Sequence, residues 1–270
     1  MRSNLLKVLA LGDVVGPLGV GAVSSELRKI KHSLGAELVL VNGENAYISN
    51  GLDSASADAI FRAGADVITG GNHSLHLHDM HDRFDEDPFI LRPINLSPRS
   101  PGKGYTVFQL KNGKRILVIS ACGQVFMDPA NSPFYAVDKL LEELEGKYDF
   151  AIADLHAEAT SEKHAFFRAF DGRINIMYGT HTHVQTADEM LLPKGSACIS
   201  DLGMCGVVES VLGVKIETIV KKYMTGVSDR FSKAEGDVAL CGALFSLDMD
   251  SGFVTAVERV RVVVPQAKCR

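Results

Sequence analysis

The chain has 270 residues, of which 46 % are hydrophobic and 23 % charged, and its formal net charge is −5 at pH 7. This is an ordinary globular composition, and the length allows a sizeable buried core. The negative net charge argues against bulk electrostatic binding to nucleic acid or to an anionic membrane surface.

The cysteines disfavour two classes of small stabilised fold. They number five, are widely spaced and form no C-x-x-C pair: Cys122, Cys198, Cys205, Cys241 and Cys269. An odd, scattered set argues against a disulfide framework and against a cysteine-based zinc ribbon. We expect most of them to be small buried apolar residues in a reducing cytoplasm.

The N-terminal stretch MRSNLLKVLALGD contains a short apolar run interrupted by a lysine, and no small-residue cleavage site follows it. We interpret it as a first strand rather than a signal peptide. No window reaches 18 uninterrupted apolar residues, so the sequence predicts no membrane-spanning segment.

In chain order, strand signals alternate with helix signals through the first part of the sequence. Continuous apolar runs that end in polar residues predict strands over 7–13, 37–45 and 66–73. Helices are predicted between them over 21–33 and 54–65, the second with Ser54 as N-cap and Gly64 near its end. The order βαβαβ favours parallel strands joined by right-handed crossovers.

The rest of the chain adds antiparallel signals. Segment 89–104 is rich in proline and predicts an ordered surface loop, and residues 105–120 predict a hairpin that turns at Asn112-Gly113. Alternating residues on both sides of a turn at 250–252 predict a C-terminal hairpin. Further strands are predicted over 150–156, 174–181 and 196–203, and further helices over 133–146, 161–170 (with Thr160 or Ser161 as N-cap) and 217–224.

No internal repeat or linker divides the sequence. We therefore expect a single α/β domain over residues 1–270, with either one mixed sheet or two packed sheets.

Polar groups that suit metal binding follow five of the predicted strands. They are Asp13, Glu44 with Asn45, Asn72 with His73, His156, and the pair His181 and His183. In open α/β sheets, ligands bind just beyond the carboxyl ends of the strands, so side-by-side strands would bring these groups together at one edge.

The chemistry of this set predicts a particular kind of site. Oxygen and nitrogen ligands without thiolates suit Mn, Fe, Zn or Mg rather than copper–thiolate or iron–sulfur chemistry. Eight candidate groups are too many for one tetrahedral ion but fit two ions bridged by a carboxylate. Paired ions, roughly 3.5–4 Å apart, typically serve the hydrolysis of phosphate esters.

Each group also has a simpler interpretation. His181 and His183 could lie in a turn, and Glu44 with Asn45 could cap a helix. Asp13 could belong to a phosphate-binding loop, although GDVVGPLG lacks both glycine-rich spacings. For the run His76, His78 and His81 we favour a solvated helix near the active site over a ligand or substrate role.

Several motifs resemble the calcineurin-like metallophosphoesterases, and more closely their bacterial YmdB-like subfamily. They are GDVVG (12–16), NGEN (42–45), GNH (71–73), HAEATSEK (156–163) and GTHTHVQTAD (179–188), with RPIN (92–95), PGKG (101–104) and LPKG (192–195) extending the likeness over nearly the whole chain. Five ordered motifs with matching intervals are a specific signal, whereas GNH alone would be weak.

The resemblance implies an α/β fold, a four-layer α/β/β/α sandwich with two mixed sheets flanked by helices, and an enzyme that hydrolyses phosphodiesters. The implied substrates are 2′,3′-cyclic nucleotides or related small nucleotides, and the implied cofactors are two divalent or transition-metal ions per chain, Fe or Mn before Mg or Zn. Matched residue by residue, one ion would be held by Asp13, Glu44, Asn45 and His183, and the other by Glu44, Asn72, His156 and His181, with Glu44 bridging. His73 is then left for proton donation.

Some positions depart from the wider pattern. Val15 stands where the superfamily has the histidine of Asp-x-His, and Glu44 bridges where aspartate is frequent; both fit the subfamily. SLHLHDMHD (74–82) replaces an expected Trp-Asp, and Gly19-Val20-Gly21 an expected arginine. Two aspartates, Asp154 and Asp188, are candidate partners for ligand histidines.

Two other functions are alternatives to the phosphodiesterase. They are a regulatory nucleotide- or partner-binding protein with structural metals, and a phosphomonoesterase. A homo-oligomer fits either class.

Overall fold

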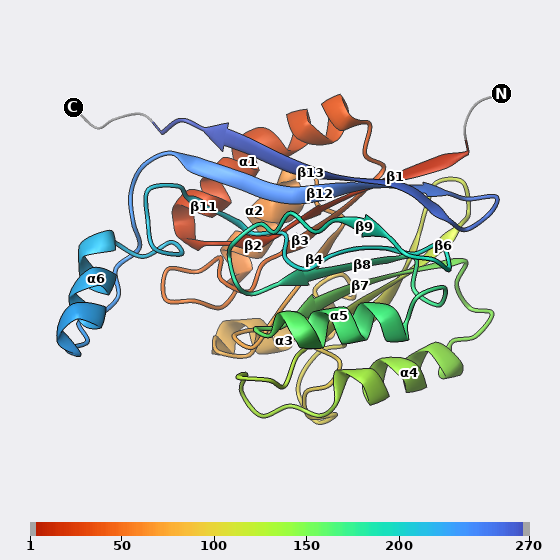
Figure 1. Ribbon diagram of the computed structural model, residues 1–270, viewed down its shortest axis with the longest axis horizontal. Helices are drawn as coiled ribbons and strands as arrows, with labels where there is room; N and C mark the ends of the chain where they lie inside the picture. The colour runs from red at the N-terminus through yellow and green to blue at the C-terminus, as the bar shows by residue number, and fades with distance from the viewer. Residues whose placement is uncertain (1–3, 267–270) are drawn as a thin grey trace.

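The structure is a computed structural model that describes residues 4–266. Its strands form two mixed sheets (Figure 1). The seven-stranded sheet has the order β2-β11-β12-β1-β3-β4, with β13 paired to β12, and the six-stranded sheet has the order β5-β6-β7-β8-β10-β9.

The strands of the first sheet are β1 (Leu5–Leu11), β2 (Asp13–Val14), β3 (Leu38–Asn42), β4 (Val67–Thr69), β11 (Met204–Val207), β12 (Val238–Asp248) and β13 (Val254–Val264). Those of the second are β5 (Tyr105–Gln109), β6 (Arg115–Cys122), β7 (Phe150–His156), β8 (Ile176–Thr180), β9 (Met190–Leu191) and β10 (Ala197–Ile199). The helices are α1 (Gly16–Leu34), α2 (Ser54–Ala63), α3 (His81–Glu86), α4 (Pro133–Glu143), α5 (Thr160–Ala169) and α6 (Ile216–Thr225), and η1 (His78–Met80) is a short 3₁₀ turn.

Strands β3, β7 and β8 are buried along their whole length because both faces of each sheet are covered there. In β1 the side chains alternate: Leu9 and Leu11 pack with α1 and α2, whereas Val8 and Ala10 pack in the layer between the sheets. The second sheet packs its other face against α4 and α5. The four layers α/β/β/α expected from the resemblance are thus confirmed (Figure 1). The single domain stays a prediction.

The main connections follow the predicted order. Strands β1, β3 and β4 are parallel neighbours, and β6, β7, β8 and β10 form a second parallel run. The two predicted hairpins are confirmed as β5–β6 and β12–β13, both antiparallel. The carboxyl ends of these parallel strands carry the candidate residues.

Helix boundaries differ from prediction in three places. Helix α1 begins at Gly16 rather than near residue 21. Its first turn contains a proline, which is tolerated there because the backbone N–H that proline lacks would have no partner in the helix. The N-cap of α2 is Asp53, whose Oδ1 accepts from Ser56 N at 3.3 Å, so Ser54 was the wrong prediction. Neither Thr160 nor Ser161 caps α5, whose N-cap position is Ala159 with no side-chain bond.

Other corrections concern segments with weak sequence signals. Residues 89–104 do not simply cover the surface, because Ile90 and Leu91 are buried and hydrogen bonds join Phe89 and Leu91 to Ile68 at the edge of β4. The short strands β9 and β11 were not predicted. Among the described cysteines, Cys122, Cys198, Cys205 and Cys241 are buried and free, and Cys269 lies outside the described residues.

Helix α6 projects from the rest of the protein (Figure 1). None of its residues is buried, so it rests on no core of its own. The segments on either side of it pair with each other and form one wall of a cavity described below. Across residues 4–266, no helix has the length and apolar character needed to cross a membrane. The cytoplasmic location stays a prediction.

Candidate metal centre

The candidate residues come from strand ends of both sheets rather than from neighbouring strands of one. Asp13, Glu44, Asn45, Asn72 and His73 follow β1, β3 and β4 of the first sheet. His156, His181 and His183 end or follow β7 and β8 of the second. The structure brings all eight together between the layers, and Asp13, Glu44 and His156 are almost inaccessible to solvent.

Four of these side chains meet around one nitrogen atom. His156 Nε2 lies 3.2 Å from Glu44 Oε1, 3.1 Å from Asn72 Oδ1 and 3.0 Å from His181 Nδ1. The ligand atoms of Glu44, His156 and His181 all lie within 4.8 Å of one another. A carboxylate, an amide oxygen and two imidazoles in this arrangement form a candidate site for one cation.

A second group adjoins the first through Glu44. Asp13 Oδ1 lies 3.7 Å from His183 Nε2, and Asn45 Nδ2 lies 3.3 Å from the same nitrogen and donates to Glu44 Oε1 at 2.8 Å. Asp13 Oδ1 is buried and has no hydrogen-bond partner among the described residues. A buried carboxylate oxygen without a partner is costly, and a cation at this position would satisfy it. The residues present therefore fit a metal ion.

The outer nitrogens of two histidines are held by acceptors. His183 Nδ1 donates to Leu212 O at 3.2 Å, and His181 Nε2 lies 3.2 Å from a carboxylate oxygen of Glu158. Both bonds orient the ring and leave the inner nitrogen, Nε2 of His183 and Nδ1 of His181, available as a ligand atom.

The third histidine is held by a two-step network. His156 Nδ1 lies 2.9 Å from Thr180 Oγ1, which donates to Asp154 Oδ1 at 2.7 Å. Asp154 therefore acts on His156 through Thr180 rather than directly. Asp188 does not serve a candidate ligand: it bonds to Ser200 and lies beside His164, so its predicted role was wrong. Proximity in sequence to the GTHTH motif was misleading, because the partners of Asp188 are Ser200 and His164 rather than a candidate ligand.

The buried charges shift one another's titration. Burial raises the pKa of Glu44, but His156 and His73 outweigh it and hold the pKa well below its ordinary value. Burial raises the pKa of Asp13, and His183 and His156 offset only part of this. These carboxyl groups lie beside one another, and cations nearby would favour the ionised form of both.

The pKa values of the two facing histidines, His156 and His181, shift in opposite directions. Burial lowers the pKa of His156, but the carboxylates of Glu44 and Asp13 outweigh it and raise the pKa to about 9. Burial and the charge of His156 lower the pKa of His181 to about 3. At neutral pH the metal-free pair thus carries one extra proton, on His156, whose ring is then charged. The Nε2 proton of that ring points at the atoms that a cation would bind.

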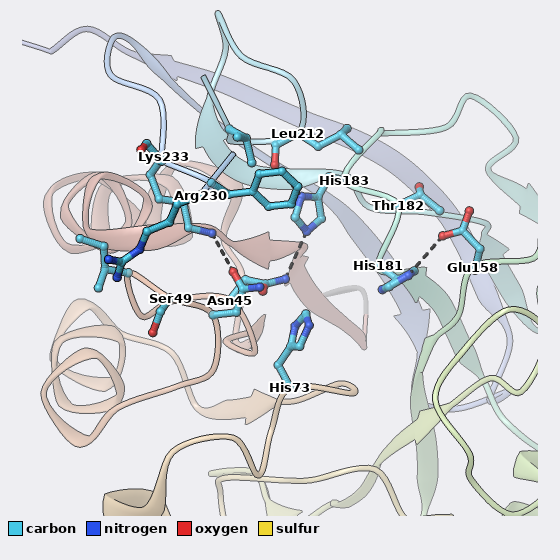
Figure 2. A pocket seen from close by; sticks show the side chains of 15 residues that line it. Asn45, Ser49, His73, Glu158, His181, Thr182, His183, Leu212, Arg230 and Lys233 are labelled. Atoms are coloured by element: carbon cyan, nitrogen blue, oxygen red, sulfur yellow. Dashed lines mark hydrogen bonds and ion pairs between the residues drawn. The ribbon is translucent and has the colours of Figure 1, made fainter. Parts of the chain in front are cut away.

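A cavity of about 590 Å³ opens beside these groups (Figure 2). His73 lines it, with Nδ1 3.0 Å from Glu44 Oε1 and its backbone nitrogen donating to Glu44 Oε2 at 3.0 Å. Figure 2 shows the His73 ring pointing into the space between Asn45 and His181. Glu44 therefore fixes His73 at the edge of the candidate metal centre.

The loop that carries His181 and His183 has an uncommon backbone. Their φ angles are 98° and 65°, in the region that favours glycine. Asp201 Oδ2 holds the residue between them, accepting from Thr182 N at 3.0 Å and from Thr182 Oγ1 at 2.8 Å. Sequence reasoning missed Asp201, although the polar residues that end the predicted strand over 196–203 were a signal of the same kind.

Close packing requires a glycine beside the cluster. A Cβ atom at Gly71 would lie 2.2 Å from Glu44 Oε2 and 2.5 Å from His156 Nε2. The glycine before Asn72 thus lets the β4 loop approach both candidate ligands.

The histidine-rich segment borders the cavity: the ring of His76 packs edge-on against that of His73, with the ring centroids 4.8 Å apart. His76 and His78 are exposed, and His81 Nε2 lies 3.2 Å from Leu75 O. His76 precedes η1 rather than belonging to a helix, so the predicted solvated helix is correct only from His78 onward. None of the three belongs to the lining of the cavity.

Comparisons with known proteins place the chain in a family. Residues 9–260 match the family described as YmdB-like protein. A curated relative from Bacillus subtilis (strain 168), named 2′,3′-cyclic-nucleotide 2′-phosphodiesterase, is 38 % identical over 95 % of this chain and 97 % of its own.

Two solved structures superpose over nearly the full chain. One, a hypothetical protein from Thermus thermophilus, has a TM-score of 0.90 at 36 % identity and covers 96 % of this chain and 100 % of its own. The other, described as a novel phosphatase from Mycoplasma pneumoniae, has a TM-score of 0.91 at 33 % identity and covers 98 % and 95 %. The Bacillus subtilis relative is named a phosphodiesterase and the Mycoplasma pneumoniae structure a phosphatase, which confirms the expected class of enzyme.

Proposed function

Because the chain belongs to the YmdB-like family, we propose that it is a phosphodiesterase that hydrolyses 2′,3′-cyclic nucleotides or related small nucleotides with two bound metal ions. The observation that carries the proposal is the convergence of His156 Nε2, His181 Nδ1 and Glu44 Oε1 beside the unsatisfied Asp13 Oδ1. The name of the Bacillus subtilis relative supports the substrate class.

The proposed ligands fall into two sets that share Glu44. One contains Asp13, Asn45 and His183, and the other contains Asn72, His156 and His181. The mixed oxygen and nitrogen donors favour Fe or Mn, with Mg or Zn as alternatives. When bound, paired ions activate water as a nucleophile and neutralise charge on the phosphate.

His73 is the proposed proton donor. Its Nδ1 faces the carboxylate of Glu44 and so carries a proton, and the imidazolium form of the ring would deliver its second proton from Nε2 to the leaving oxygen. Without that proton the departing alkoxide would carry a full negative charge. The ring lines the cavity, so it can reach a substrate held at the metal centre.

A screen of substrates on metal-replete protein tests the proposal. We expect hydrolysis of bis-p-nitrophenyl phosphate and of 2′,3′-cyclic AMP, with a much slower rate on 3′-AMP. Faster release of phosphate from 3′-AMP than opening of the cyclic diester would favour a phosphomonoesterase, the alternative that the Mycoplasma pneumoniae structure's description supports. Tight binding of nucleotide without any turnover would favour a regulatory binding protein.

A further inference from the structure

The cavity beside the candidate metal centre has a second wall that the ligand set does not explain. This wall comes from the segments on either side of α6. Val214 and Lys233 pair as an antiparallel bridge, and Ala234 N donates to Gly213 O at 2.9 Å. The same wall carries Leu212, whose carbonyl accepts from His183 Nδ1 at 3.2 Å. Hydrogen bonds therefore join the two segments of this wall to each other, and one more joins the wall to the candidate ligand His183.

Lys233 crosses the cavity from this wall to the opposite one. Its Nζ donates to Asn50 Oδ1 at 2.9 Å, and its aliphatic carbons pack over Gly16. Figure 2 shows Lys233 reaching from this wall to the side chains around Asn45, whereas the guanidinium of Arg230 lies on the side away from the histidines.

The charge of Lys233 has no counter-ion in the described part of the chain. Its one side-chain partner is a neutral amide, and it forms no ion pair with any described carboxylate. Burial lowers the pKa of Lys233, and the negative charge of Glu44 offsets only part of this. Lys233 is half-buried, lines the cavity and has no anionic partner there. Its ammonium is therefore electrostatically complementary to a phosphate group.

The cavity also has accessible apolar surface, beside the polar side chains of Ser49, Arg230 and Ser232. Ile48, Leu212 and Phe231 line the cavity, and all three are exposed large side chains, at 58 %, 46 % and 53 % of their full accessible surface. The volume of about 590 Å³ falls in the range typical of small-molecule sites and suits one nucleoside-sized group. The cavity thus offers apolar side chains as well as the polar groups of the metal centre.

We propose that Lys233 binds an oxygen of the substrate phosphate, and that Ile48, Leu212 and Phe231 bind the organic group esterified to that phosphate. The proposal rests on the proposed function only in placing the phosphate at the metal centre. It makes Lys233 a substrate-binding residue that acts alongside the metals.

Two measurements on metal-replete, full-length protein test this. The first is the KM for bis-p-nitrophenyl phosphate. The second, which needs no turnover, is the Kd of inorganic phosphate by titration calorimetry. Lys233→Met should raise both by about tenfold or more, because a charge-assisted hydrogen bond is lost, while the metal content stays unchanged. Lys233→Arg should retain most of the affinity. Phe231→Ala should weaken the binding of adenosine 3′-monophosphate but leave the Kd of inorganic phosphate unchanged.

Lys221→Met is the matched control. Lys221 lies on α6, between the two segments that form the wall, but its ammonium pairs with Asp229 at 2.7 Å on the surface. It should leave both constants unchanged. Wild-type constants in Lys233→Met, an equal loss in Lys233→Met and Lys233→Arg, or a loss of metal from Lys233→Met would each overturn the proposal. A wild-type protein that binds phosphate through Lys233 but hydrolyses nothing would uphold it while refuting the proposed function.

Discussion

The Lys163 ammonium lies 2.8 Å from the Asp201 carboxylate, and both side chains are almost wholly buried, at 2 % and 1 % exposure. The same carboxylate oxygen holds Thr182, the residue between His181 and His183. The ion pair thus fixes the loop that presents two candidate ligands, although neither partner touches the centre itself.

Removing either partner should loosen that loop. We expect Lys163→Met to lower the free energy of unfolding by about 3–5 kcal/mol, because it leaves a buried carboxylate unpaired, and to weaken metal binding in the protein that remains folded. Asp201→Asn, which keeps one acceptor for Thr182, should weaken metal binding with a smaller loss of stability. Melting curves and metal titrations measure the two effects. If Asp201→Asn bound metal as tightly as the wild type, this positioning role would be refuted.

His73→Asn should separate proton donation from metal binding. The variant keeps a polar side chain beside Glu44 but cannot donate a proton to the leaving oxygen. We expect kcat to fall by about 10²–10⁴ with the metal content retained. Substrates with a better leaving group, such as p-nitrophenol esters, should lose less activity than a cyclic nucleotide. An equal loss on both substrates would argue against proton donation.

Gly71→Ala should disable the centre through sterics alone. The new Cβ would lie 2.2 Å from Glu44 Oε2 and 2.4 Å from His156 Cδ2, so at least one of these side chains must move. We expect the variant to bind less metal and to lose activity. Gly21→Ala in α1 is the control, because no atom lies within 4 Å of its Cβ, and it should stabilise the helix by about 0.5–1 kcal/mol. Normal metal content in Gly71→Ala would contradict this packing.

Metal binding should release a proton near neutral pH. Because the pKa of His156 is raised to about 9, its ring is protonated in the metal-free protein at pH 7.5 and must lose that proton to become a ligand. His181, with a pKa of about 3, is already neutral and contributes none. The apparent affinity should therefore rise with pH until about pH 9. Calorimetry in buffers of different ionisation enthalpy counts the protons, and a count of zero would contradict the assignment.

Much of the fold could be predicted because its signals are local. The apolar runs of β1, β3 and β7 read as strands, since strands covered on both faces need no polar alternation. The hairpin turn at Asn112-Gly113 is likewise encoded in two residues. The N-cap of α2 was missed because Asp53 and Ser54 both suit a cap, and the start of α1 because Gly16, Gly19 and Gly21 lie within its first two turns. The burial of 89–104 depends on contacts with β4 that are distant in sequence.

The candidate centre was predictable for a related reason. Strand-end residues are recognisable one strand at a time, and the parallel arrangement brings those of each sheet to one edge. The packing of the two sheets, which joins the two sets, was not predicted. What supports them was not predictable. Lys163 and Asp201 meet across 38 residues, and Lys233 reaches Asn50 across 183. No local pattern marks such pairs, since only the packing of distant segments creates them. The ligand roles themselves stay predictions.

The most direct test of the two-metal account is a metal titration of chelator-treated protein, with hydrolysis of bis-p-nitrophenyl phosphate followed at each addition. We expect no activity without metal and full activity at about two ions per chain. His156→Ala and His181→Ala should bind less metal and remain inactive, while His164→Ala, which alters a histidine outside the centre, should match the wild type. Hydrolysis that persists after chelation, or that is unaffected by His156→Ala, would contradict the account.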